Sequence, residues 1–191
     1  MRQVMIHSYR ILQAGLLPRR LSEFAKDKRG VSAVEFAMLL PLMLTLYLGG
    51  VEVSQGNSID RKVTMTARTV ADLVAQVSTI DTTGVNAALG ASAAVLAPYP
   101  DTNAKITVSV VTIDANGNAK ITWSATKNGT ARAVGSNVTV PDALKIASTS
   151  LVWGEASYNY TPAIGYVVTG AMTLTDQIFM RPRLSDTVTK T

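Results

Sequence analysis

The segment KDKRGVSAVEFAMLLPLMLTLYLGGVEV, from Lys26 to Val53, contains a long apolar run. Residues 31–51 hold a single charged residue, Glu35, and residues 36–51 hold none. At about 1.5 Å rise per residue, a helix of this length spans the roughly 30 Å core of a bilayer. Because the run is apolar on all faces and follows a basic segment, we predict a transmembrane helix over 31–53 rather than a buried core helix. Pro41 is compatible with this prediction, since membrane helices tolerate proline.

The positive charge of the chain is concentrated before this run. Residues 1–30 hold seven of the 18 Lys and Arg residues and two of the 13 acidic residues, so they carry the whole formal net charge of +5. Positively charged flanks stay cytoplasmic, which predicts a cytoplasmic leader over 1–30 and residues 54–191 on the outer side. Glu52 follows the run, in keeping with this orientation. The neutral body gives no reason to expect nucleic-acid binding.

A cleaved secretory signal peptide is an alternative interpretation of this N-terminal region. Such a signal has a short basic region, a short apolar run and a small-x-small cleavage site. Here the basic region is long, the apolar run is long, and no A-x-A site follows it, although small residues occur at Gly49, Gly50, Ser54 and Gly56. These features favour a retained anchor.

The residues around Glu35 form a recognisable pattern. The sequence KRGVSAVEF, from Lys28 to Phe36, resembles the processing site of type IV pilin-like proteins. In that family a basic leader ends in glycine, the fifth following residue is glutamate, an aromatic residue comes next, and an apolar helix follows. The longer stretch RGVSAVEFAMLLPLM is similar to the start of TadE-like proteins, the minor pseudopilins of tight-adherence (Flp) pilus systems. The segments ASYNYTP (156–162) and MRPR (180–183) resemble the closing pattern of the same family.

The resemblance implies a cleavage site and a set of partners. A membrane-embedded prepilin peptidase would cut between Gly30 and Val31, with Lys28, Arg29, Glu35 and Phe36 forming the processing and assembly motif. Glu35 would become the fifth residue of the mature chain and meet the amino terminus of a neighbouring subunit. The implied partners are the lipid bilayer, other pilins or pseudopilins, the pilus assembly platform and the peptidase.

The physics of a carboxylate near a bilayer agrees with such a role for Glu35. An unpaired carboxylate there costs on the order of 2–3 kcal/mol, and a freed α-amine at Val31 is a natural counter-ion. The plainer interpretation is that Glu35 reaches the cytoplasmic headgroups by snorkelling. That is feasible because it lies only about 6–8 Å along a helix from Val31.

The region from 54 to 100 is expected to form a helical stalk. Val63, Ala67, Val70, Val74 and Val77 recur at helical spacing, which predicts an amphipathic helix over 60–77 that continues the membrane segment. A break is expected near 55–57, where glycine and asparagine occur. A second, alanine-rich helix is predicted over 82–96, before two prolines.

The region from 101 to 191 is expected to form a β-rich domain outside the membrane. Residues 105–113, 119–127, 150–162 and 172–180 are rich in strand-forming side chains, and the Asn116-Gly117 pair predicts a hairpin turn between the first two. We therefore predict an α+β fold in which a small antiparallel sheet of three to five strands packs on helix. Tyr158 and Tyr160, two residues apart, should point to one side of a strand.

The sequence offers little for catalysis or metal binding. It has no cysteine, and its one histidine, His7, lies in the leader, so the usual nucleophilic dyads and zinc sites cannot be built in the outer region. The segment 114–118 faintly resembles the start of an EF-hand but lacks the distal glutamate, since Ala125 stands there. We expect no enzyme, no cofactor, no metal and no small-molecule substrate.

These observations lead to one expectation and two alternatives. The expected protein is a TadE-like minor pseudopilin of the bacterial inner membrane, processed after Gly30. One alternative is an unprocessed, single-pass periplasmic binding or envelope-structure protein. The other is a secreted protein that is cut after the apolar run.

Overall fold

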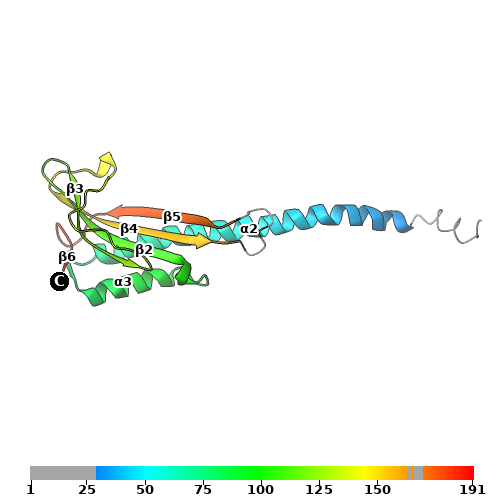
Figure 1. The fold of residues 1–191 in the computed structure, drawn as a ribbon, viewed down its shortest axis with the longest axis horizontal. Helices are drawn as coiled ribbons and strands as arrows, with labels where there is room; N and C mark the ends of the chain where they lie inside the picture. The colour runs from blue at the N-terminus through cyan, green and yellow to red at the C-terminus, as the bar shows by residue number, and fades with distance from the viewer. Residues whose placement is uncertain (1–28, 163–164, 166–169) are drawn as a thin grey trace, which may run out of the picture. The chain divides into compact units, whose positions relative to one another are not determined.

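The computed structural model describes residues 29–162, 165 and 170–191. Lys28 and His7 lie outside the described residues. The described elements, in chain order, are α2 (Arg29–Ala75), β1 (Thr79–Ile80), α3 (Thr82–Ala94), β2 (Ala104–Ile113), β3 (Ala119–Lys127), β4 (Thr149–Tyr160), β5 (Met172–Met180) and β6 (Thr189–Lys190), with 3-10 turns at Asp101–Asn103 and Asp142–Leu144 (Figure 1). The chain divides into two compact units between Leu46 and Tyr47, within α2. The predicted α+β fold is confirmed.

Helix α2 is continuous from Arg29 to Ala75, so the break predicted near 55–57 is wrong. A glycine inside a helix costs about 1 kcal/mol relative to alanine, which packing readily offsets. At Gly56 an ideal Cβ would lie 3.7 Å from the Tyr160 ring, so this turn of the helix lies beside β4. Ile59, one turn further on, is 2% exposed. Tertiary contacts therefore stabilise the helix across residues 55–57, where the local sequence favours a break.

The first unit contains the apolar part of α2 up to Leu46. Nearly all the described side chains of this part of the helix are exposed. Every described side chain from Gly30 to Leu44 is exposed, and so is Leu46. Pro41 has no N–H to donate, and the Thr45 hydroxyl donates a hydrogen bond to the Pro41 carbonyl at 2.8 Å. By its length and composition this is one helix able to cross a membrane, which fits a membrane anchor.

The second unit is built on a four-stranded antiparallel sheet in the order β3-β2-β4-β5. The predicted strands are all found, with small shifts of their ends. The hairpin between β2 and β3 turns at Gly117, whose φ of 82° favours glycine. Asp114 holds the turn, because its Oδ1 accepts from the backbone N–H groups of Asn116 and Asn118 at 2.9 and 2.8 Å. This is the predicted hairpin turn.

One face of the sheet packs on α2 and α3 (Figure 1). The predicted helical stripe is the face of α2 that does so: Val63, Ala67, Val70 and Val74 are at most 1% exposed. They meet the strand residues that alternate toward them, which include Ile106, Val108, Val110, Val152 and Ala156. Burying apolar side chains in this way stabilises the domain by about 1.5–3 kcal/mol for each fully buried Val or Ile.

Helix α3 begins at a side-chain cap, in the region where a helix was predicted. The Asp81 carboxylate accepts from the N–H of Gly84 at 2.7 Å, which satisfies one of the unpaired N–H groups at the helix start. Val85, Leu89 and Ala93 face the core. The helix therefore closes the hydrophobic layer between α2 and the sheet.

The C-terminal segment returns to the helices through a short parallel pair, β1 with β6. Val188, just before β6, is fully buried, and its carbonyl accepts from the Trp123 indole N–H at 2.7 Å. The sequence analysis did not predict this pair. Two-residue strands carry no periodic pattern, so nothing in the sequence marks them.

Candidate functional site

The sequence motif expected to guide processing lies at the start of α2. Arg29 is the first residue of α2 that the structure describes, and Gly30 and Val31 follow it in the helix. At Gly30 an ideal Cβ would meet nothing within 4 Å. Gly30 is exposed, and the Val31 side chain is 54% exposed.

Glu35 lies four residues after Val31, so the two occupy the same face of α2 one turn apart. Glu35 is exposed, as is Phe36, which is 59% exposed. Within residues 29–162, 165 and 170–191, no ion pair reaches Glu35. The structure thus leaves its carboxylate accessible to a partner group beside it.

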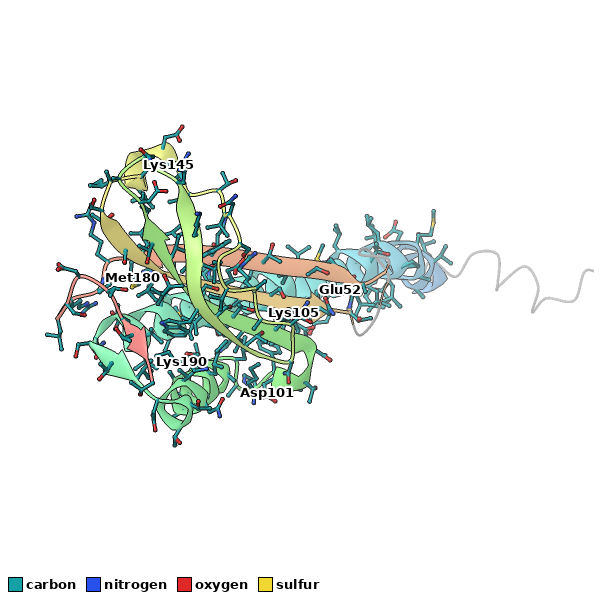
Figure 2. The ribbon with its side chains drawn as sticks, turned by 60° about the vertical axis from the view of Figure 1, so that its left-hand side comes forward. Glu52, Asp101, Lys105, Lys145, Met180 and Lys190 are labelled. Carbon is teal, nitrogen blue, oxygen red and sulfur yellow. The ribbon has the colours of Figure 1, made fainter. Side chains whose placement is uncertain are left out.

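At the C-terminal end of the apolar run, the side chains of α2 begin to be buried by other parts of the chain. Gly49 and Glu52 are buried, and Ile59 and Val63 continue the same face of the helix. The Tyr160 hydroxyl donates to the backbone carbonyl of Glu52 at 3.5 Å. Burial, with a smaller effect from Glu52, raises the pKa of the Tyr160 hydroxyl above its usual value. The second unit therefore packs on α2 from this position onward (Figure 2 labels Glu52).

The two tyrosines of the closing pattern are core residues. Tyr158 and Tyr160 are 4% and 6% exposed, and both lie on the sheet face that packs on α2, as their spacing predicts. The Tyr158 ring also meets Tyr99 edge to face, with centroids 6.5 Å apart. They are not free to form a binding face, and core packing is their role.

The Pro-Arg at the end of the same pattern closes the end of α2. The backbone N–H of Arg183 donates to the carbonyl of Ala75, the last residue of the helix, at 2.9 Å. This hydrogen bond satisfies one of the unpaired carbonyls at the helix end. The Arg183 guanidinium also pairs with Asp72 in the last turn of α2. Arg181 and Arg183 follow β5, which ends at Met180, the end predicted for this strand.

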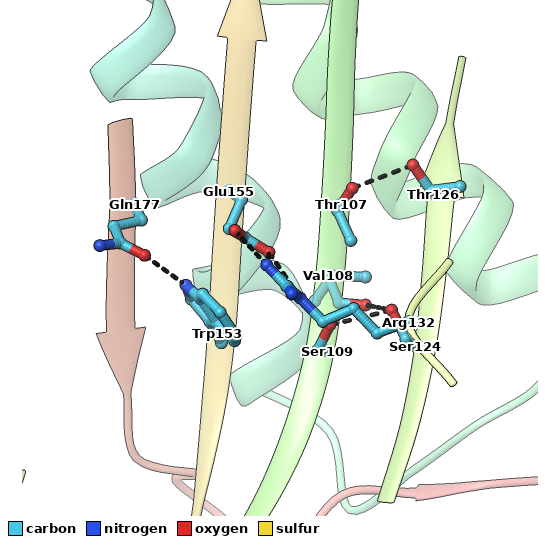
Figure 3. A network of polar contacts seen from close by, with 9 residues as sticks. All are labelled: Thr107, Val108, Ser109, Ser124, Thr126, Arg132, Trp153, Glu155 and Gln177. Atoms are coloured by element: carbon cyan, nitrogen blue, oxygen red, sulfur yellow. Dashed lines mark hydrogen bonds and ion pairs between the residues drawn. The ribbon is translucent and has the colours of Figure 1, made fainter. Parts of the chain in front are cut away.

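A polar network that the sequence analysis missed lies on the other face of the sheet (Figure 3). The Arg132 guanidinium forms a two-pronged pair with Glu155, with Nη2–Oε1 at 2.6 Å and Nε–Oε2 at 3.2 Å. It also lies 4.0 Å above the ring of Trp153, which stacks on Phe179 and donates from Nε1 to Gln177 at 3.1 Å. Arg132 stands in the irregular segment between β3 and β4. No local pattern could place it over β4.

This network borders a groove of about 630 Å³ on the outer sheet face. The groove is lined by Lys105, Thr107, Thr130, Arg132, Glu155, Ala156, Ser157, Thr175, Asp176 and Gln177. Hydroxyl groups also join β2 to β3 on this face. The hydroxyls of Thr107 and Thr126 form a hydrogen bond of 3.0 Å, and those of Ser109 and Ser124 form one of 2.9 Å. Among the described residues, no group of three His, Cys, Asp or Glu side chains could hold a metal ion.

Comparison with known proteins assigns a family to the helical part of the chain. Residues 30–72 match the model of a family described as TadE-like protein. No curated protein matches, and no solved structure matches. The matched residues begin at Gly30, include Glu35 and cover nearly all of α2. This match supports the resemblance to TadE-like proteins over residues 30–72, and it does not extend to the segments 156–162 and 180–183.

Proposed function

We propose that this protein is a TadE-like minor pseudopilin that takes part in assembling a tight-adherence pilus. It acts without catalysis, through processing after Gly30 and lateral packing of its apolar helix. The observation that carries this proposal is the family match over residues 30–72, which places Gly30 and Glu35 within a TadE-like segment.

The geometry of α2 supports the processing step. Gly30 and Val31 are exposed residues of α2, and the basic residues of the leader precede them in the sequence. The leader faces the cytoplasm of the inner membrane, so a prepilin peptidase would meet the bond on that side. Cleavage would release an α-amine at Val31, at the edge of the apolar helix.

The exposure of the first unit supports the packing step. Its helix exposes apolar side chains on all faces, with Met38, Leu42, Met43 and Leu46 between 57% and 75% exposed. Lipid or neighbouring apolar helices can cover such a surface, and the helix of a partner pilin offers the same chemistry. Glu35 would then neutralise the amino terminus of a neighbouring subunit or bind the assembly platform.

A second candidate function is that of an unprocessed, membrane-anchored periplasmic protein. The groove beside Arg132 and Glu155 favours this alternative, because it gives the second unit a surface of its own for binding. Here the apolar helix is only an anchor, and Glu35 contacts headgroups.

N-terminal sequencing of the protein, purified from membranes of its native host with the peptidase present, tests the proposal. A mature chain beginning at Val31 supports pilin-type processing. A chain beginning at Met1 favours the anchored alternative, and a chain beginning after Val53 identifies an ordinary secretory signal. The same measurement in a host lacking the prepilin peptidase is the control, and there the chain should keep its leader.

A further inference from the structure

We propose that the groove on the outer sheet face binds a neutral oligosaccharide. This inference does not rest on the pilus role, because it concerns only the second unit. Figure 3 shows the charged pair at its border, where Arg132 meets Glu155 above β4, and Figure 2 labels Lys105 on β2.

The shape and size suit one short flexible ligand. A volume of about 630 Å³ falls within the usual range for ligand sites, roughly 300–1,000 Å³. The outer face of the sheet differs along its length. At one end, Val140 of the segment between β3 and β4 packs in a cluster with Val111 and Leu151 of the sheet. At the other end the face carries polar side chains and forms the open groove.

The charges that line the groove balance, so the groove has no net attraction for a charged ligand. Its lining holds two cations, Lys105 and Arg132, and two anions, Glu155 and Asp176. Arg132 is already neutralised by Glu155 through two nitrogen atoms. Lys105 and Asp176 have opposite signs, so a ligand with several charges of one sign would meet a charge of its own sign in the lining. A neutral ligand can bind without breaking the pair.

The hydrogen-bonding groups are those that recognise hydroxyls. Ser157 on β4 faces Thr175 on β5 and Lys105 on β2 in register, so these side chains form one row across the sheet. Thr107, Glu155 and Gln177 form the next row. Hydroxyls and amides both donate and accept hydrogen bonds, and a carboxylate accepts them, which suits a sugar. Within the described part of the chain, no hydrogen bond involves Arg132 Nη1, so that edge is available to donate.

The lining is rigid before any ligand arrives. Arg132 is fixed on one side by Glu155 and below by Trp153, and Trp153 is itself fixed by Phe179 and Gln177. An ordinary solvated surface has mobile arginines that lose conformational entropy on binding. A preorganised guanidinium avoids much of that cost and gains affinity.

Calorimetric titration of the full-length protein in lipid nanodiscs tests the proposal, since sugar-based detergents would compete. The probes are cellotetraose, maltotetraose and chitotetraose, with tetragalacturonate as the anionic comparison. We expect saturable binding of at least one neutral probe, with a dissociation constant at or below about 1 mM, and weaker binding of the anionic probe. No saturable binding of any neutral probe to the folded protein, or tighter binding of tetragalacturonate, would overturn the proposal.

The double variant Ser157→Ala and Thr175→Val assigns the binding to the groove. Both side chains line it, and neither forms a hydrogen bond with another described residue, so the fold should be unchanged. Affinity should fall at least about tenfold because hydroxyl contacts are lost. The matched control is Thr189→Val, an exposed threonine on β6 outside the groove, which should bind as the wild type does. Unchanged affinity in the double variant would place the binding elsewhere and refute the assignment.

Discussion

Gly154 on β4 lies directly against the backbone of Ala67 on α2. An ideal Cβ at Gly154 would collide with the Ala67 carbonyl oxygen and would lie 2.9 Å from the Ala71 side chain. Only glycine lets the helix approach this strand so closely. The central contact between α2 and the sheet therefore depends on the absence of one side chain.

Gly154→Ala should lower the free energy of unfolding of the second unit by about 1–3 kcal/mol, because the added methyl group forces the helix and the sheet apart. Urea unfolding of the detergent-solubilised protein, followed by tryptophan fluorescence, measures this. Gly90→Ala is the control: Gly90 lies within α3 with nothing within 4 Å of its ideal Cβ, so the change should stabilise by about 0.5–1 kcal/mol. Equal stability of the Gly154→Ala variant and the wild type would show that this approach is not tight.

Trp123→Phe tests how strongly the C-terminal segment is held. The variant leaves the buried Val188 carbonyl without its donor, and an unsatisfied buried group costs about 1–3 kcal/mol. Trp153→Phe is the comparison, because its partner Gln177 is exposed and can turn to water. Thermal unfolding should show the larger loss for Trp123→Phe, and equal losses would contradict the role of this hydrogen bond.

Much of the second unit could be predicted because its strands are regular. The strands and the Asn-Gly turn follow from residue type, and the helical stripe of Val63, Ala67, Val70 and Val74 marks the buried face of α2. The prediction of a break near Gly56 is wrong because local helix propensity contains no information about the Tyr160 ring that lies beside this glycine. Packing between distant segments decides such positions.

The two surfaces proposed for function differ in how visible they are in the sequence. The segment from Gly30 to Phe36 is contiguous, so its pattern can be identified without a structure. The groove assembles Arg132 from an irregular segment with Glu155 and Gln177 from two strands. Only the register of the sheet brings these residues together, and sequence spacing does not encode it.

Asp114 should make the stability of the hairpin depend on pH. Hydrogen bonds from Asn118, then Asn116, hold the pKa of its carboxyl below the usual value. A carboxyl with a depressed pKa in the folded state stabilises the protein above the unfolded pKa, near pH 4, and this contribution is lost as pH falls through the folded pKa. The melting temperature of Asp114→Ala should therefore lie below that of the wild type at neutral pH and approach it in acid. A difference in melting temperature between Asp114→Ala and the wild type that stays constant with pH would refute the proposed origin.

Glu35→Gln should leave membrane insertion and the fold of the second unit intact, because Glu35 is exposed and forms no ion pair with another described residue. If Glu35 neutralises an amino terminus during packing, the neutral amide cannot replace it, and surface pili should be strongly reduced. Immunoblots of membrane fractions check insertion, and electron microscopy of the native host counts the pili.

The matched control for this experiment is Asp60→Asn, which removes an exposed carboxylate from the same helix beyond the apolar run. Piliation should be normal in that strain, because a carboxylate outside the membrane is screened by water and salt and needs no counter-ion. Normal piliation of the Glu35→Gln strain would instead assign Glu35 to headgroup contact. A carboxylate that snorkels to water can be replaced by an amide at little cost, whereas one that pairs with a buried α-amine cannot.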